Sequence, residues 1–272
     1  MKRSIPARTA SLLALICFAV FSGAQTSQTI YTTNLGQPDE ITTNELIQAL
    51  GNPNTVVFDA RPPLEYATSH IPGALNVAQK PGVPFSEYVS DVAEINRILN
   101  GDHSKALIVY CNGPFCGKSK RLSTELSAAG WNVRRYQLGI PTWRALVGLT
   151  QIEVSAMSLV YKQDKTAVWI DVREPADFTR KSIRGAVNIP RSLVTTVKDT
   201  GELKKAKDDG RLPMNDHNTR VIVFAENPAD ARYVAAAIAN EAFHNVMFFH
   251  GSFQEARDAV RGVKKTEDES ND

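Results

Sequence analysis

The chain has 272 residues, of which 43% are hydrophobic and 22% are charged, and its formal net charge is +2. These values are typical of a globular protein, and the length allows two domains that each bury a core. The basic residues form no patch with interleaved aromatic residues, which argues against nucleic-acid binding.

The amino end has the pattern of a secretory signal. Basic residues at positions 2, 3 and 8 precede an apolar run over residues 10–21, and small residues at 22–24 provide a cleavage site. About twelve apolar residues are too few to cross a bilayer core as a helix. We therefore expect residues 1–24 to be a signal peptide, with export to a bacterial periplasm and no stable membrane insertion after the signal is removed.

Residues 30–152 follow the rhythm of an α/β domain. A helix begins at a capping box formed by Thr42 and Glu45 and ends at Gly51, and a later helix carries Leu122 and Leu126 on one face. Residues 85–99 also have helical spacing. Strands are predicted at residues 55–59, 106–110 and 131–139. Apolar strands that alternate with helices indicate a mostly parallel sheet flanked by helices.

Residues 153–263 repeat this order, with strands predicted at 168–171, 220–224 and 245–249. The boundary is expected near residues 151–154. Residues 264–272 are polar, and we expect a disordered tail.

The two halves are copies of one domain. Residues 59–77 match residues 171–189 at a constant offset of 112 positions, which is unlikely by chance. The identical pairs are Asp59 and Asp171, Arg61 and Arg173, Pro63 and Pro175, Ile71 and Ile183, Gly73 and Gly185, Ala74 and Ala186, and Asn76 and Asn188. The sequence thus predicts an α/β protein of two similar domains.

The copies differ at the end of one apolar strand. Cys111 ends the strand ALIVY in the first copy, whereas Ala225 stands at this place in the second. Asn112-Gly113-Pro114 turns the chain toward a helix that we expect to begin near Lys118 or Ser119. Loop amides and a helix N-terminus at this place would hold an anion and lower the pKa of the thiol. The alternative is that Cys111 is a small buried residue that only ends a strand.

Export would determine how many cysteines remain in the protein and whether they are oxidised. Once the signal is removed, only Cys111 and Cys116 remain, and an oxidising compartment would favour a disulfide between them if the geometry allows it. Two cysteines and scattered histidines do not supply a four-ligand zinc set. We expect neither a metal nor a cofactor.

The chain resembles the tandem-domain rhodaneses, which are sulfurtransferases. The matching features are Asp59 and Arg61, the segment 70–74 (HIPGA), the strand-ending Cys111, and Gly139-Ile140-Pro141 with Trp143. The resemblance implies that Cys111 carries a persulfide, taking sulfane sulfur from a small anionic donor such as thiosulfate and passing it to a thiophilic acceptor. It also implies that the loop holds the sulfur and the donor's oxyanion. The loop residues concerned are Asn112, Gly113, Phe115, Gly117, Lys118 and Ser119.

Three features depart from that family pattern. The cysteine lies in the first copy rather than the second, and its loop is two residues longer than the loop after Ala225. The longer loop suggests phosphatase or arsenate chemistry, but Lys118 lacks the bidentate fork of the arginine that such loops carry. Cys116 has no counterpart. It is either a resolving cysteine for Cys111, half of a permanent disulfide, or a bystander.

Other polar residues are weaker candidates. Asp59 and Arg61 are expected to pair with each other or with loop carbonyls, because both copies have them. His70 is expected to be a structural turn residue, and Trp143 either lines the mouth of the site or anchors the core.

The leading interpretation is an exported sulfurtransferase that works through a Cys111 persulfide. One alternative is a thiol–disulfide oxidoreductase that uses Cys111 and Cys116. Another is a non-catalytic module that binds a sulfur carrier or a protein partner, which the acidic loop after Ala225 favours. The sequence identifies neither the donor and acceptor nor the oligomeric state.

Overall fold

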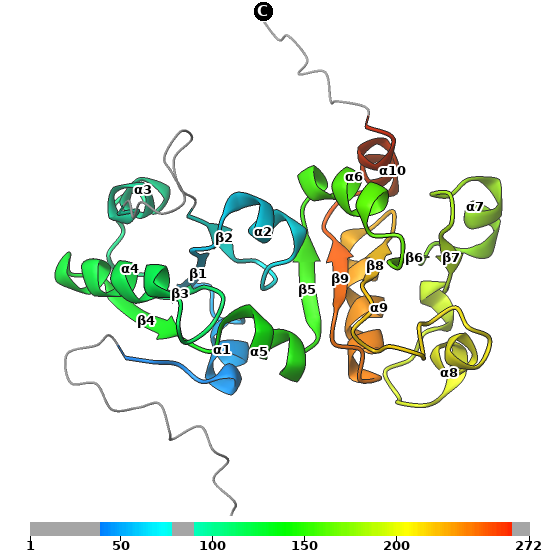
Figure 1. Ribbon diagram of the computed structural model, residues 1–272, viewed down its shortest axis with the longest axis horizontal. Coiled ribbons are helices and arrows are strands. Elements are labelled where there is room, and N and C mark those ends of the chain that lie inside the picture. The colour runs from blue at the N-terminus through cyan, green and yellow to red at the C-terminus, as the bar shows by residue number, and fades with distance from the viewer. Residues whose placement is uncertain (1–38, 78–89, 263–272) are drawn as a thin grey trace, which may run out of the picture. The chain divides into compact units, whose positions relative to one another are not determined.

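A computed structural model describes residues 39–77 and 90–262 (Figure 1). The predicted signal peptide and tail lie outside these residues, so both stay predictions. None of the helices in the described ranges is long and apolar enough to cross a membrane.

The first domain contains a four-stranded, wholly parallel sheet with the order β2-β1-β3-β4. Its elements are α1 (Thr43–Ala49), β1 (Thr55–Asp59), α2 (Pro63–Thr68), β2 (Leu75–Asn76), α3 (Val92–Ile98), β3 (Ala106–Tyr110), α4 (Gly117–Ala128), β4 (Asn132–Tyr136) and α5 (Gly139–Leu146). The capping box of Thr42 and Glu45 is present as predicted. The predicted helix over residues 85–99 begins later, at Val92, and its residues 85–89 lie outside the described ranges.

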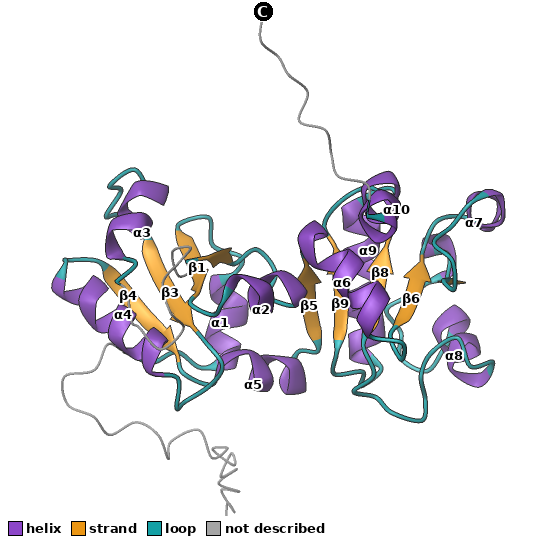
Figure 2. Cartoon of the chain, turned by 45° about the horizontal axis from the view of Figure 1, so that its top comes forward, coloured by secondary structure: helices purple, strands orange, loops and turns teal. Residues whose placement is uncertain are grey.

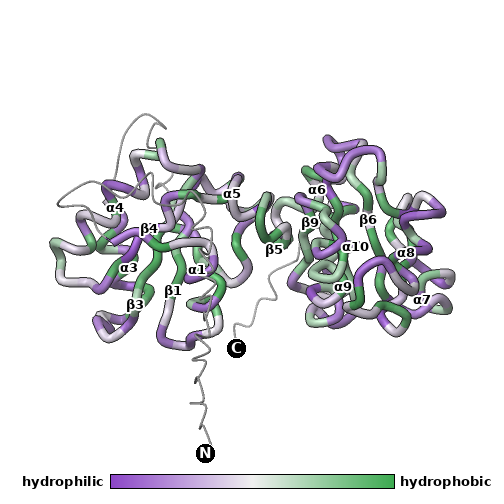
Figure 3. Tube along the Cα trace, turned by 90° about the horizontal axis from the view of Figure 1, so that it is seen from below, coloured by the Kyte–Doolittle hydropathy of each residue, from purple (hydrophilic) through white to green (hydrophobic). Residues whose placement is uncertain are grey.

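Two cores cover the two faces of this sheet because side chains alternate along each strand. Ile108 of β3 packs on the face covered by α1 and α5, together with Leu46 and Trp143. The flanking Leu107 and Val109 pack on the other face, against α3 and α4. Figure 2 shows helices on both sides of the strands, and Figure 3 shows that the strands include the most hydrophobic parts of the trace. The predicted mostly parallel sheet is confirmed.

The second domain has a five-stranded parallel sheet with the order β5-β9-β8-β6-β7. Its elements are β5 (Leu149–Ile152), α6 (Val154–Gln163), β6 (Val168–Asp171), α7 (Pro175–Arg180), β7 (Val187–Asn188), η2 (Arg191–Leu193), α8 (Gly201–Asp208), β8 (Val221–Phe224), α9 (Pro228–Asn240), β9 (Val246–Phe249) and α10 (Phe253–Arg261). The sequence did not predict β5. This strand exists because its four residues pair with β9, which is distant in the chain. The domain boundary itself stays a prediction.

Candidate functional site

Cys111 follows β3, an inner strand of the first sheet, as the sequence predicts. The carboxyl ends of inner parallel strands are where open α/β sheets place their ligands. Its side chain is 5% exposed, and its carbonyl oxygen accepts a hydrogen bond from the amide of Ile140 at 3.1 Å. The thiol position is therefore held by the sheet on one side and by the start of α5 on the other.

The structure joins Cys111 and Cys116 by a disulfide, with their Cα atoms 6.1 Å apart. Of the three roles left open for Cys116, the bridge excludes the bystander. A turn places the cysteines opposite each other: Gly113 has a positive φ of 129°, and its carbonyl oxygen accepts the Cys116 amide at 3.0 Å. Helix α4 begins at Gly117, slightly earlier than predicted, with Cys116 as its N-cap.

A buried arginine that the sequence analysis did not single out supports the loop. Arg135 of β4 is 5% exposed and donates from Nη2 to the carbonyl oxygen of Pro114 (3.1 Å) and from Nε to Ser119 Oγ (3.2 Å). Burial lowers its pKa, an effect opposed by the carboxylate of Glu40. Arg135 pairs across the sheet with the residue two before Cys111, and Phe248 pairs with the residue two before Ala225, so Phe248 occupies this place in the second domain. The sequence did contain a signal for this role: an arginine stands in the copy with the cysteine at a strand position that is apolar in the other copy.

The other predicted loop residues lie in different surroundings. Asn112 donates from its side chain to Glu65 Oε2 at 2.7 Å, and the side chain of Phe115 is 97% exposed. Lys118 Nζ lies 3.3 Å from the carboxylate of Asp91, which is 3% exposed. Burial raises the pKa of Asp91, although the charge of Lys118 opposes this shift. The cation of Lys118 is thus partly offset by a neighbour rather than wholly free to attract a substrate anion.

The backbone of the loop packs tightly against Gly139, the first residue of α5. Gly139 has a φ of +65°. A Cβ atom placed there would lie 2.3 Å from the carbonyl oxygen of Cys111 and 2.5 Å from the amide nitrogen of Gly113. Only glycine allows both this conformation and this approach.

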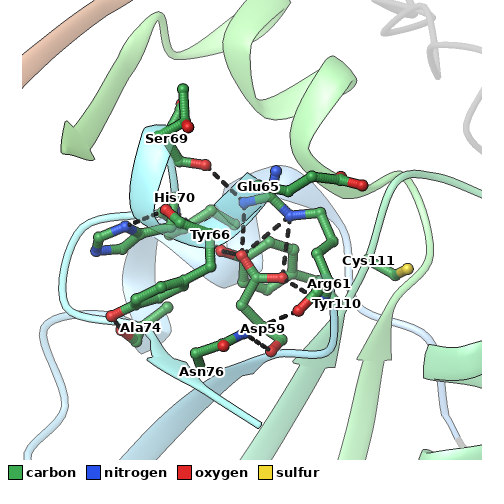
Figure 4. A network of polar contacts seen from close by, with 12 residues as sticks. Asp59, Arg61, Glu65, Tyr66, Ser69, His70, Ala74, Asn76, Tyr110 and Cys111 are labelled. Atoms are coloured by element: carbon green, nitrogen blue, oxygen red, sulfur yellow. Dashed lines mark hydrogen bonds and ion pairs between the residues drawn. The ribbon is translucent and has the colours of Figure 1, made fainter. Parts of the chain in front are cut away.

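A buried polar network lies beside Cys111 (Figure 4). Asp59 binds the guanidinium of Arg61 at 2.5 Å and accepts the hydroxyl of Tyr110 at 2.6 Å, and Arg61 also donates to the carbonyl oxygen of Ser69. Burial alone would lower the pKa of Arg61, but the Asp59 carboxylate outweighs it and the pKa is raised. Burial and the charge of Asp59 also raise the pKa of Tyr110. The predicted pairing of Asp59 with Arg61 is confirmed, and Arg61 also makes the expected hydrogen bond to a loop carbonyl.

The same pairing recurs in the second domain. Arg173 binds Asp171 at 2.7 Å and donates to the carbonyl oxygen of Lys181. Phe224 occupies the place of Tyr110, so the hydroxyl of Ser182 donates to Asp171 instead, at 2.7 Å. Because the arrangement exists in both domains, it is a scaffold for the strand end rather than a source of chemistry.

His70 and Trp143 are structural in their contacts. His70 is fully buried, with Nδ1 2.9 Å from the carbonyl oxygen of Tyr66 and Nε2 3.4 Å from Glu153. Burial lowers its pKa, while the Tyr66 carbonyl and Glu153 act in the opposite direction. Trp143 is 2% exposed and donates from Nε1 to the carbonyl oxygen of Leu149 at 2.7 Å. This favours the core-anchor role of Trp143 over the pocket-mouth role.

Comparison with known families decides the relationship. The family model for the rhodanese-like domain matches the chain twice, over residues 42–146 and 157–259. The chain belongs to the rhodanese family. The first match contains every strand of the first sheet, and the second match contains every strand of the second sheet except β5. Rhodanese-like domains support a function of the sulfurtransferase type.

Individual relatives of this chain are distant. It is 34% identical over 116 residues, or 42% of the chain, to the HTH-type transcriptional regulator Rv0324 of Mycobacterium tuberculosis, and spans 46% of that protein. The BH2092 protein from Bacillus halodurans is 22% identical, with 42% of this chain and 77% of that chain covered and a TM-score of 0.35. A thiosulfate sulfurtransferase from Pseudomonas aeruginosa is 18% identical, with 78% and 43% covered and a TM-score of 0.34.

The second rhodanese-like domain has a pocket where the first has its cysteine loop. The pocket has a volume of about 500 Å³, and Ala225 lies in its wall. Its charged lining residues are Arg173, Arg180, Arg191, Glu174, Asp177, Glu226 and Asp230. The arginines are close to carboxylates: Arg173 pairs with Asp171, Arg180 with Asp177, and Arg191 lies 3.7 Å from Asp230. Without a thiol and with its cations paired, this loop lacks the means for sulfur transfer.

Proposed function

We propose that the protein is an exported sulfurtransferase that carries sulfane sulfur on Cys111. The observation that supports this most is the position of Cys111, at the carboxyl end of the inner strand β3 in a rhodanese-like domain, where the loop turns into the N-terminus of α4. A helix N-terminus favours negative charge, so it would stabilise both the thiolate and the oxyanion of a donor.

The bridge requires a step before sulfur transfer, because a sulfur in a disulfide is not a nucleophile. A dithiol reductant supplies the two electrons. Its thiolate attacks Sγ of Cys116, the S–S bond breaks, and Cys111 leaves as a thiolate. The second thiol of the reductant then releases Cys116 and closes the reductant's own disulfide. Cys116 is the sulfur to attack because its residue is half-buried, whereas Cys111 is only 5% exposed.

Sulfur transfer then proceeds in two displacements. The Cys111 thiolate attacks the sulfane sulfur of thiosulfate, the S–S bond of the donor breaks, and sulfite leaves with the electron pair. Cyanide or another thiophile attacks the outer sulfur of the persulfide and restores the thiolate. If no acceptor arrives, the Cys116 thiolate attacks Cys111 Sγ, releases hydrosulfide and reforms the bridge.

The test is intact-mass analysis of protein that has been reduced, desalted and treated with thiosulfate. We expect the mass of one added sulfur atom, mapped to Cys111, to accumulate in Cys116→Ser, whereas the wild type, which has no acceptor in this assay, should release the sulfur as hydrosulfide and reform its bridge. Cys111→Ser should gain no sulfur and form no thiocyanate from thiosulfate and cyanide. Sulfur addition in Cys111→Ser, or none in reduced Cys116→Ser, would refute the assignment.

A second candidate, a thiol–disulfide oxidoreductase, is supported by the bridge itself. In that case Cys111→Ser and Cys116→Ser damage activity equally, and the pair exchanges electrons with a dithiol without needing any sulfur donor. In the sulfurtransferase, Cys116→Ser instead remains active and no longer requires prior reduction. The two variants assayed side by side with thiosulfate and cyanide distinguish these functions.

A further inference from the structure

A pocket of about 290 Å³ lies away from the cysteine loop, between helix α5 and the segments that precede β8 and β9. It is lined by Pro141, Arg144, Ala145, Asn218, His244 and Asn245. Its volume is at the lower end of the range for small-molecule sites. The sulfur-transfer proposal uses none of these residues, and the family resemblance includes only Pro141 among them.

Short backbone contacts hold the walls of this pocket together. Val246 donates its amide to the carbonyl oxygen of Gly148 at 3.1 Å, just beyond the end of α5. A Cβ atom on Gly148, which has a φ of +75°, would lie 2.6 Å from the carbonyl oxygen of Phe243. The end of α5 and residues 243–246 are therefore in direct contact, which positions Arg144 relative to His244 and Asn245.

Arg144 is a cation without a carboxylate partner among the described residues. Its Nε is buried and has no hydrogen-bond partner there. The two arginines that act on it electrostatically are both paired, Arg61 with Asp59 at 2.5 Å and Arg220 with Asp164 at 3.3 Å. Burial, followed by repulsion from Arg61 and Arg220, lowers the pKa of Arg144 to about 10. At neutral pH the guanidinium is still charged, so its charge is partly desolvated and uncompensated, which is costly.

The polar groups around Arg144 indicate which kind of ligand would compensate its desolvated charge. The guanidinium offers a planar fork of donors that matches a carboxylate, phosphate or sulfate group. Asn245 Oδ1 is a buried acceptor without a partner in the described ranges, while its Nδ2 donates to the carbonyl oxygen of Asn218 at 3.1 Å. The site thus combines a cationic donor with one free acceptor.

We propose that this pocket binds a small oxyanion, with Arg144 as its principal anion-binding group. An oxyanion that also carries a hydroxyl, such as hydrogen phosphate, supplies acceptor oxygens to Arg144 and a donor to Asn245. The carboxylate at the end of a small organic acid offers the same acceptor oxygens to Arg144 but has no hydroxyl for Asn245, so titration with an inorganic and an organic anion distinguishes the two sources. This site is independent of sulfur transfer at Cys111.

The test is isothermal titration of the whole mature chain with inorganic phosphate and, separately, with succinate, at constant ionic strength. We expect saturable binding of at least one anion to the wild type, and at least tenfold weaker binding to Arg144→Gln. The matched control is Arg134→Gln, which removes an arginine that already pairs with Glu45 at 2.9 Å and should leave affinity unchanged. Absence of saturable binding to the wild type, or equal binding to Arg144→Gln, would overturn the proposal.

Thermal unfolding provides a second measurement that separates binding from a structural role. Since Arg144 has no carboxylate partner in the part of the chain that the structure describes, the unfolding temperature of Arg144→Gln without anion should equal or exceed that of the wild type. The bound anion should raise the unfolding temperature of the wild type and of Arg134→Gln but not of Arg144→Gln. A marked fall for Arg144→Gln without anion would instead make Arg144 a structural residue and contradict the proposal.

Discussion

Replacement of Gly139 by alanine should destabilise the first domain and its cysteine loop more than the same replacement at another glycine with positive φ. The comparison uses Gly130, which lies between α4 and β4. Both glycines have positive φ, +65° at Gly139 and +82° at Gly130, so alanine is strained at both. The strain of the left-handed region costs about 1–2 kcal/mol at either position. A Cβ on Gly130 meets nothing within 4 Å, so Gly130→Ala has no further cost.

Gly139→Ala adds a backbone clash to this common cost. Its Cβ would lie 2.3 Å from the carbonyl oxygen of Cys111, so the two segments must separate by about 1 Å to restore ordinary contact. That movement weakens the hydrogen bond from Ile140 to the same carbonyl. Overpacking of this kind costs about 1–3 kcal/mol, which gives a total of about 2–5 kcal/mol.

The assay for this pair is urea unfolding together with the rate of thiocyanate formation. The first domain should unfold at lower urea in Gly139→Ala than in Gly130→Ala, and the rate should fall only in Gly139→Ala because only there does the carbonyl of Cys111 move. Unfolding is followed separately for the two domains, since a two-domain chain need not unfold in one step. Equal midpoints and equal rates for the two variants would refute the packing argument.

Three further changes test the surroundings of the site. Asp59→Asn leaves the buried guanidinium of Arg61 without its carboxylate and should destabilise the first domain by about 3–5 kcal/mol in urea unfolding; a loss below about 1 kcal/mol would contradict the network. Arg135→Met, which removes both hydrogen bonds from this side chain to the loop, should speed amide hydrogen exchange at residues 115–119, and unchanged exchange there would count against its supporting role. His70→Gln should flatten the pH dependence of stability below pH 6.5. Folding lowers the pKa of His70 from 6.5, so the unfolded chain binds the proton first and stability falls as pH falls through this window, by at most about 1.4 kcal/mol per pH unit. Identical pH profiles for the variant and the wild type would contradict this.

Much of the architecture could be predicted from the sequence because it depends on local patterns. The apolar strands, the capping box at Thr42 and the repeat itself are properties of short segments, and each is present in the structure. The position of Cys111 also followed from the sequence, since a residue after an apolar strand lies at the carboxyl edge of a parallel sheet. Strand β5 was not predicted, because it depends on pairing with β9, which is distant in the chain. The start of α3 at Val92 was not predicted either.

Hydrophobic periodicity and repetition along the chain were enough to predict two α/β domains and a single strand-ending cysteine. The folded structure was needed to show that Cys111 is bridged to Cys116, that Arg135 supports the loop and that Lys118 faces Asp91. It also shows that the Nε of Arg144 is buried without a hydrogen-bond partner among the residues that the structure describes. These features depend on which charged and sulfur atoms come within a few ångströms of one another, and that distance is set by folding rather than by spacing in the chain.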